Sequence, residues 1–224
     1  MTPPGSPDTL VIDSATEACS VALVRAGAQG DQVIAGSWQM MGRGHAEALV
    51  PLIGALPGKG RAGRIAVALG PGSFTGVRVG LAAARALALA WGAELVGYPT
   101  LALIAAQARA QAGVRASAQP VTVATTGGHG EWFVQEFTAD GLPAGALASL
   151  RPEAAALAAR TALVAGSQAE ALVAARGSGH ALPLWSDARA FALLPPALLT
   201  ADTAPLYGRA PDAKLPGGAG ATPR

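Results

Sequence analysis

The first third of the chain alternates short apolar runs with polar turns. Thr9–Asp13 is a continuous apolar run that ends in a carboxylate, a pattern typical of a buried strand. Ser20–Arg25 and Gln32–Met40 follow at roughly ten-residue spacing, with the turn-like Gly27–Asp31 between them. This order predicts three strands in series as an antiparallel meander.

Helical and strand patterns then alternate. A helix is predicted over His45–Leu56, although Pro51 lies inside the pattern and either kinks the helix or delays its start. The clearest helical run is Thr75–Ala90, which Gly92 is expected to end. The remaining elements predicted here are strands Ile65–Leu69 and Glu94–Gly97 and a helix over Leu101–Ala112, with Thr100 as its N-cap.

The pattern after Gly113 predicts a second α/β half. Pro120–Ala124 and Trp132–Phe137 are expected to pair around the turn Thr126–Gly130. Further along we predict helices over Glu153–Ala159, Gln168–Ala175 and Arg189–Leu199, and a strand over Ala162–Ala165.

These elements divide the chain into two predicted subdomains, residues 8–100 and residues 101–215. The second subdomain is expected to be reduced. Its C-terminal segment either stays within it or returns to the first subdomain. Residues 1–7 and 216–224 are expected to be disordered ends.

Composition excludes several classes of protein. Charged residues make up 13% of the chain and the formal net charge is +2, so a strongly electrostatic nucleic-acid binder is not expected despite a pI of about 9.1. Cys19 is the only cysteine, which excludes an internal disulfide. No basic-then-apolar leader opens the sequence, and the apolar stretch Leu81–Trp91 is interrupted by Arg85 and too short for a membrane span. A cytoplasmic location is therefore expected.

Two turns carry candidate chemistry. Asp13–Thr16 follows a predicted strand. A carboxylate beside small polar residues in such a turn can organise a phosphate or a metal-bound water, or it can simply accept hydrogen bonds from the backbone of its own turn. Gly70–Gly76 joins a strand to a helix N-terminus, a place that suits anions, although a tight turn with a Ser73 or Thr75 cap explains it equally well. The glycine spacing is not that of a dinucleotide-binding loop.

The helix after the glycine turn has a face of small residues. Gly76, Gly80 and Ala84 lie about one turn apart, so this face packs closely either on the chain's own sheet or on a partner helix. The three histidines, His45, His129 and His180, are scattered and form no pair with metal-ligand spacing. No metal site and no catalytic residue are therefore predicted.

Four blocks together resemble the TsaB family. They are Ile12–Leu23, Gly44–Pro51, Gly70–Leu81 and Pro205–Arg209, and their order and spacing match the family. The resemblance is dense over about residues 9–112. The resemblance implies an α/β protein with the actin/Hsp70/sugar-kinase (ASKHA) fold, built from two related α/β subdomains.

The resemblance also implies a function. Members of this family support a catalytic paralogue, TsaD, with the ATPase TsaE, in adding threonylcarbamoyl to N6 of adenosine 37 in tRNAs that read codons beginning with A. A noncatalytic dimerisation subunit of that complex is therefore expected, with tRNA reached through the complex and a homodimer as an alternative pairing. No cofactor is expected in this chain itself, and ATP or ADP with magnesium is expected only at the level of the complex.

The chain departs from proteins of this fold at three places. The paralogue's metal-binding HxxxH has no counterpart, since the corresponding Gly97–Leu103 contains no histidine. Ala15 stands where active kinases of this fold have glycine, and Thr126–Gly128 replaces an Asp-Ala-Arg stretch of related chains. Weak or absent nucleotide hydrolysis is expected. Ala15 and the missing acidic residue disfavour one alternative, an ATP-dependent kinase-like enzyme, and the absent histidine pair disfavours the other, a metallopeptidase.

The candidate residues follow from these motifs. A weak nucleotide-related set is expected at the two turns: Asp13, Ser14, Thr16, Gly72 and Ser73. A partner interface is expected on two helices of the first subdomain: His45, Leu49, Ile53, Gly76, Arg78, Gly80, Leu81 and Ala84.

Overall fold

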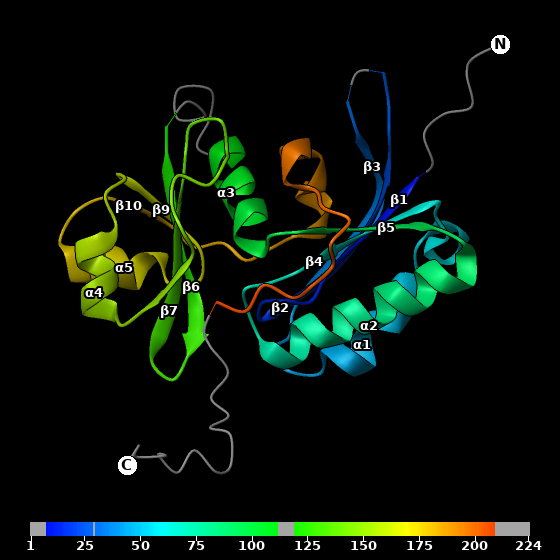
Figure 1. The fold of residues 1–224 in the computed structure, drawn as a ribbon, viewed down its shortest axis with the longest axis horizontal. Helices are drawn as coiled ribbons and strands as arrows, with labels where there is room; N and C mark the ends of the chain where they lie inside the picture. Colours follow the sequence, from blue (N-terminus) through cyan, green and yellow to red (C-terminus); the bar gives the residue numbers. More distant parts are fainter. Residues whose placement is uncertain (1–7, 29, 112–118, 209–224) are drawn as a thin grey trace, which may run out of the picture.

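The computed structural model describes residues 8–28, 30–111 and 119–208. Within these residues the chain forms two five-stranded sheets with helices packed on them (Figure 1). The predicted ends 1–7 and 216–224 lie outside the described residues.

The first sheet has the strand order β3-β2-β1-β4-β5. The antiparallel part is β1 (Thr9–Asp13), β2 (Ala18–Arg25) and β3 (Gln32–Met40), which confirms the predicted meander. β4 (Arg64–Ala68) pairs parallel with β1, and β5 (Glu94–Tyr98) pairs parallel with β4. β1 and nearly all of β2 are buried because helices cover both faces of the sheet.

Two helices lie together on one face of this sheet. α1 (His45–Gly54) contains Pro51 and is followed by the short 3-10 helix η1 (Pro57–Gly60). α2 (Phe74–Trp91) starts at the predicted glycine turn, with Ser73 as N-cap and Gly92 in the left-handed conformation at its end. The other face is covered by the 3-10 helix η2 (Ala188–Leu193). α3 (Thr100–Gln111) packs between η2 and the second sheet and is buried along most of its length (Figure 1).

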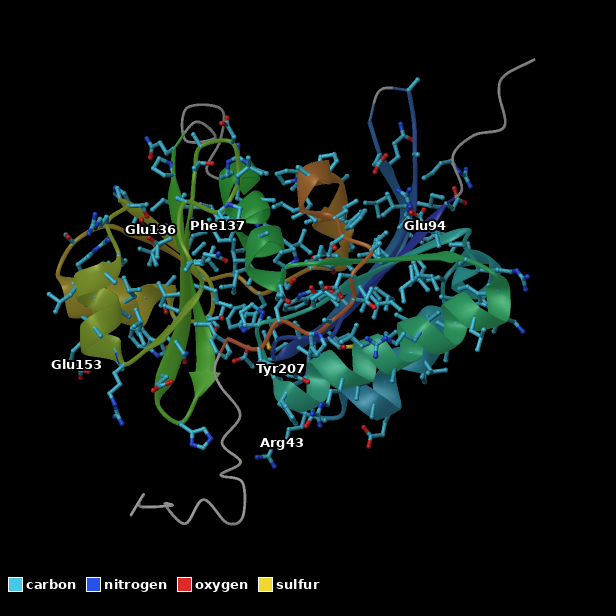
Figure 2. All side chains as sticks on the ribbon, viewed as in Figure 1. Arg43, Glu94, Glu136, Phe137, Glu153 and Tyr207 are labelled. Atoms are coloured by element: carbon cyan, nitrogen blue, oxygen red, sulfur yellow. The ribbon has the colours of Figure 1, made fainter. Side chains whose placement is uncertain are left out.

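The second sheet has the order β10-β9-β6-β7-β8. The hairpin of β6 (Val121–Gly128) and β7 (Glu131–Phe137) is confirmed, as are α4 (Pro152–Ala158), β9 (Leu163–Ala165) and α5 (Ala169–Arg176). Figure 2 shows Phe137, fully buried, on this sheet and Glu153 on the outer helix α4. Two edge strands, β8 (Ala148–Leu150) and β10 (His180–Leu182), escaped prediction because three residues are too few to show a period.

The predicted single helix over Arg189–Leu199 is wrong. The structure has two 3-10 helices instead, η2 (Ala188–Leu193) and η3 (Pro196–Leu198). Pro195 and Pro196 lack the N–H groups that a continuous helix needs, so the chain breaks there.

The C-terminal segment crosses back to the first sheet. Gly97 and Thr200 form an isolated antiparallel bridge, and the Leu206 N–H donates to Leu69 O at 2.7 Å. Arg85 on α2 donates to Thr203 O at 2.8 Å. These contacts are those of a segment that returns to the first subdomain rather than one that stays within the second. The exact subdomain boundaries stay a prediction.

Candidate functional site: a cavity between the two sheets

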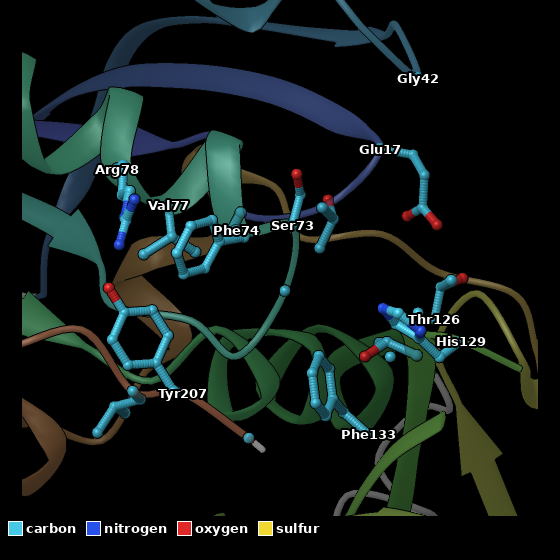
Figure 3. Close-up of a pocket in the computed structure, with 18 residues that line it drawn as sticks. Glu17, Gly42, Ser73, Phe74, Val77, Arg78, Thr126, His129, Phe133 and Tyr207 are labelled. Carbon is cyan, nitrogen blue, oxygen red and sulfur yellow. The ribbon is translucent and has the colours of Figure 1, made fainter. Parts of the chain in front are cut away.

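A cavity of about 700 Å³ opens where the two sheets meet (Figure 3). The first subdomain supplies the turn 15–17 and the start of α2, residues 72–78. The second supplies the β6–β7 hairpin, residues 125–133, and the C-terminal segment supplies residues 206–208. Most of this lining is apolar, which is typical of a site for an organic ligand rather than for a bare ion.

Asp13 does not face the cavity. Its carboxylate is 1% exposed and accepts hydrogen bonds from the Ser186 hydroxyl, from the Ala15 N–H at 3.1 Å and from the Tyr98 hydroxyl at 3.2 Å. Burial raises the pKa of Asp13 to about 6, and these hydrogen bonds offset only part of that effect. The carboxylate thus fastens Ser186 to the end of β1, and a nucleotide role for Asp13 stays a prediction.

Ser14 is likewise taken up by the fold. It is 2% exposed, and its hydroxyl donates to Gly76 O on α2 at 2.8 Å. The Ser14 hydroxyl thus links the end of β1 to α2, and a nucleotide role for Ser14 stays a prediction.

The other three residues of that set do line the cavity, namely Thr16, Gly72 and Ser73. Here the two turns touch each other. The Ser73 N–H donates to Ala15 O at 2.7 Å, and a Cβ on Gly72 would lie 1.9 Å from Ala15 O. One backbone donor of the glycine turn is therefore used within the protein, and the two turns are in direct backbone contact. A nucleotide role for these three residues stays a prediction.

His45 holds the turn from the side of α1. The ring is buried, and Nε2 lies 2.9 Å from Thr16 O and 3.3 Å from Ala18 O. Because carbonyl oxygens only accept, Nε2 carries the proton and donates to them. His45 is thus a positioning residue for the turn after β1, and its place in a partner interface stays a prediction.

The small-residue face of α2 packs on the chain's own sheet. A Cβ on Gly76 would lie 2.0 Å from Ser14 O, and one on Gly80 would lie 2.6 Å from Ser14 Oγ. Small residues are required here because the helix sits directly on β1. These members of the interface set named from the sequence are buried inside the protein: Leu49, Ile53, Gly76, Gly80, Leu81 and Ala84. A partner interface on the two helices stays a prediction.

Arg78, the remaining member of that set, is exposed beside the cavity. Its guanidinium lies 3.6 Å from the centroid of the Phe74 ring, and the rings of Phe74 and Tyr207 are 5.5 Å apart. Figure 3 shows Phe74, Phe133 and Tyr207 extending into the same space. Sequence reasoning missed Phe74, Phe133 and Tyr207 as site residues, although two of them stood inside the blocks that resemble TsaB.

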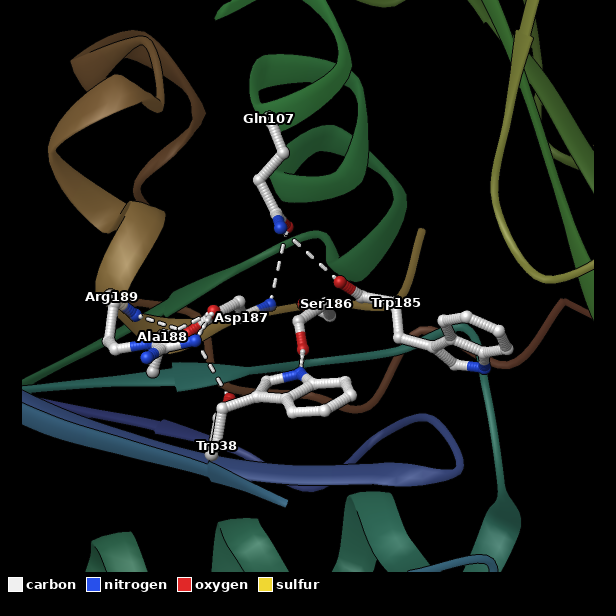
Figure 4. A network of polar contacts seen from close by, with 8 residues as sticks. Trp38, Gln107, Trp185, Ser186, Asp187, Ala188 and Arg189 are labelled. Atoms are coloured by element: carbon white, nitrogen blue, oxygen red, sulfur yellow. Dashed lines mark hydrogen bonds and ion pairs between the residues drawn. The ribbon is translucent and has the colours of Figure 1, made fainter. Parts of the chain in front are cut away.

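A polar network fixes the chain at residues 185–187 (Figure 4). The Trp38 indole N–H donates to Ser186 O at 3.2 Å, and the Gln107 amide binds both Trp185 O and the Asp187 N–H. The segment is thereby held between β3 and α3, which links residues far apart in sequence.

Side chains that could ligate a metal are scattered over the part of the chain that the structure describes. Among the residues that the structure describes, no group of three His, Cys, Asp or Glu side chains could hold an ion. Cys19 is buried in β2, where desolvation raises the pKa of its thiol to about 11. Cys19 is therefore a core residue rather than a ligand or nucleophile.

With this geometry in view, the chain was compared with known proteins. A family model described as TsaD, tRNA N6-adenosine threonylcarbamoyltransferase, matches residues 39–171. The chain belongs to this family. Within the TsaD family it is 37% identical over 101 residues to the tRNA threonylcarbamoyladenosine biosynthesis protein TsaB of Escherichia coli K12, which confirms the resemblance to TsaB. That match covers 43% of this chain and 42% of the relative, less than half of its length.

Two solved structures from Pseudomonas aeruginosa share the fold of this TsaD-family chain. YeaZ has a TM-score of 0.66 at 27% identity and covers 83% of this chain and 88% of its own. A protein described as similar to the peptidase YeaZ has a TM-score of 0.64 at 28% identity, and the match covers 82% of this chain and 87% of that protein. The fold class expected from the sequence, α/β with the ASKHA arrangement of two subdomains, is confirmed.

Proposed function

We propose that the chain is a noncatalytic subunit of a complex that adds threonylcarbamoyl to adenosine 37 of tRNA. In this proposal it supports a TsaD-like catalytic paralogue, with a TsaE-like ATPase joining the pair. Membership of the TsaD family and the similarity to E. coli TsaB support the pathway. The tRNA is reached through the complex, ATP or ADP with magnesium acts at the level of the complex, and the location is the cytoplasm.

One observation carries the scaffold role, the apolar outer surface of α1 and α2. Among the described residues α2 is the one helix long and apolar enough to cross a membrane by length and composition, a test that core helices of soluble proteins also pass. Yet only 28% of α2 is buried. An apolar helix left this open is the kind of surface that a protein partner covers.

Apolar side chains on the outside of these two helices form a defined pattern, which we call the α1–α2 outer face. On α2, the half-buried Val79 and the exposed Ala82, Ala86 and Leu89 follow one another at intervals of three and four residues, the spacing of a helix that packs against another helix. On α1, Ala46 and Val50 are exposed one turn apart, and Val50 is 65% exposed. These six residues lie on the same two helices as the interface set named from the sequence.

A pair of matched leucines tests the surface. Leu89 on α2 and Leu157 on α4 are each 87% exposed. Leu89→Asp should weaken binding to the catalytic paralogue by at least about tenfold, since it places a carboxylate in an apolar contact. Leu157→Asp should leave binding unchanged. Calorimetry of the purified proteins measures both, and equal affinity of the two variants would contradict the role of the outer face.

The same surface offers a homodimer when the paralogue is absent. Sedimentation of the isolated chain should then show a concentration-dependent dimer that Leu89→Asp dissociates and Leu157→Asp does not. A dimer that resists Leu89→Asp would place self-association on another surface.

A further inference from the structure

The cavity between the two sheets is built for a different ligand from the polyphosphates that glycine turns commonly bind. We propose that it binds a small, flat organic ligand with one aromatic ring system and a single negative charge, an aromatic carboxylate being the simplest case. This inference rests on the cavity alone and does not depend on the α1–α2 outer face or on the paralogue.

The walls set the shape and apolar character of the ligand. Phe74, Phe133 and Tyr207 point into the space from three different segments (Figure 3). Phe74 and Tyr207 are 55% and 47% exposed, which is unusual for aromatic rings in a folded protein and leaves their surfaces open to a ligand. Aromatic rings gain from edge or offset contacts with another ring, so a planar ligand suits these walls.

The charges set the number of negative groups. Arg78 lies against Phe74, and among the described residues no hydrogen bond or ion pair engages its guanidinium. Glu17 lines the cavity too, on the side away from Arg78 (Figure 3). One anionic group beside Arg78 is therefore matched, whereas a chain of phosphates would extend toward a carboxylate of the same sign.

The neighbouring turns argue against a polyphosphate for a second reason. The Ser73 N–H is already bonded to Ala15 O, and Gly72 lies in direct backbone contact with Ala15. Asp13, at the end of β1, is bonded to Ser186 and Tyr98 and does not line the cavity. Two groups that could hold a phosphate and its magnesium, the Ser73 N–H and the Asp13 carboxylate, are thus occupied by the fold itself.

Equilibrium dialysis with 2-naphthoate tests the proposal, with its neutral analogue 2-naphthamide, AMP and Mg-ATP as parallel ligands. Naphthoate should bind at a single site, and the amide should bind roughly threefold more weakly, the size of effect expected for a partly exposed ion pair. AMP and Mg-ATP should neither bind as tightly as naphthoate nor displace it.

Variants locate the binding. Arg78→Gln should reduce naphthoate affinity to that of the amide while leaving the amide unaffected, and Arg61→Gln, on an exposed arginine outside the cavity, should change neither. Tyr207→Ala should weaken both ligands, because it removes a wall rather than a charge. Absence of saturable naphthoate binding, tighter binding of either nucleotide, or equal behaviour of Arg78→Gln and Arg61→Gln would each overturn the proposal.

Discussion

Gly76→Ala probes how closely α2 lies on the turn after β1. Alanine favours a helix over glycine by about 1 kcal/mol, so propensity alone predicts stabilisation. At this position the new Cβ would lie 2.0 Å from Ser14 O and 3.2 Å from the Ser14 carbonyl carbon. Backbone atoms cannot move aside as a flexible side chain does, so α2 or the turn must shift.

Two costs then oppose the gain in propensity. Overpacking in a rigid place costs roughly 1–3 kcal/mol. The shift also strains the bond from Ser14 Oγ to Gly76 O, which contributes about 1 kcal/mol. The net expectation is a loss of about 1–3 kcal/mol in the free energy of unfolding, or several degrees in Tm.

Gly54→Ala is the matched control. Gly54 is exposed in the last turn of α1, and a Cβ there would meet nothing within 4 Å. The same substitution should therefore stabilise the chain by up to about 1 kcal/mol. Urea unfolding of the isolated protein, followed by circular dichroism, compares the two. If Gly76→Ala were as stable as Gly54→Ala, the small-residue face could not be packed on β1 as described.

Three further predictions follow from buried groups and from the turns. Burial raises the pKa of Asp13 to about 6 in the folded state, against about 3.8 in the unfolded state, so the folded state binds the proton more strongly. When the pH falls from 7 to 5, the free energy of unfolding of the wild type should therefore rise by about 1 kcal/mol relative to that of Asp13→Asn, measured in parallel unfolding titrations. An unchanged difference would refute this. Thr125→Val should be neutral or stabilising, since the buried Thr125 hydroxyl has no partner within the described residues. Thr122→Val should cost about 1 kcal/mol, because it removes the buried hydrogen bond between the Thr122 and Thr161 hydroxyls; the reverse order in thermal melts would contradict the assignment. The isolated chain with Mg-ATP should release phosphate no faster than buffer, and rapid turnover would favour the kinase-like alternative.

The sequence predicted the order of the main elements because their apolar patterns were long enough to read. The runs that became β1, α2 and the β6–β7 hairpin each carry a clear period and a turn signal beside them. Breaks caused by local chemistry were also readable in principle, and the paired Pro195–Pro196 marks the one predicted helix that failed.

The candidate site was less predictable because its decisive contacts join distant residues. Nothing near Asp13 shows that Ser186, 173 positions later, captures its carboxylate. Similarly, the small residues of α2 fit both a partner helix and the chain's own sheet, and only the position of Ser14 decides between them. Local patterns identify which residues allow close packing but not what they pack against.

The aromatic walls of the cavity show the same limit. Phe74 lies beside the glycine turn and Tyr207 lies 133 positions further along, yet their rings are 5.5 Å apart. The return of the C-terminal segment to the first sheet creates that contact. Its bonds to Leu69 and Gly97 are made by backbone atoms, which leave no mark in the sequence.

Reconstitution with the catalytic paralogue tests the central claim most directly. Threonylcarbamoyladenosine formed on tRNA would be measured with the chain alone, the paralogue alone, and both together with the TsaE-like ATPase. The account predicts product only with the full set, lost with Leu89→Asp and retained with Leu157→Asp. Product from this chain alone, or full activity of the paralogue without it, would contradict the account.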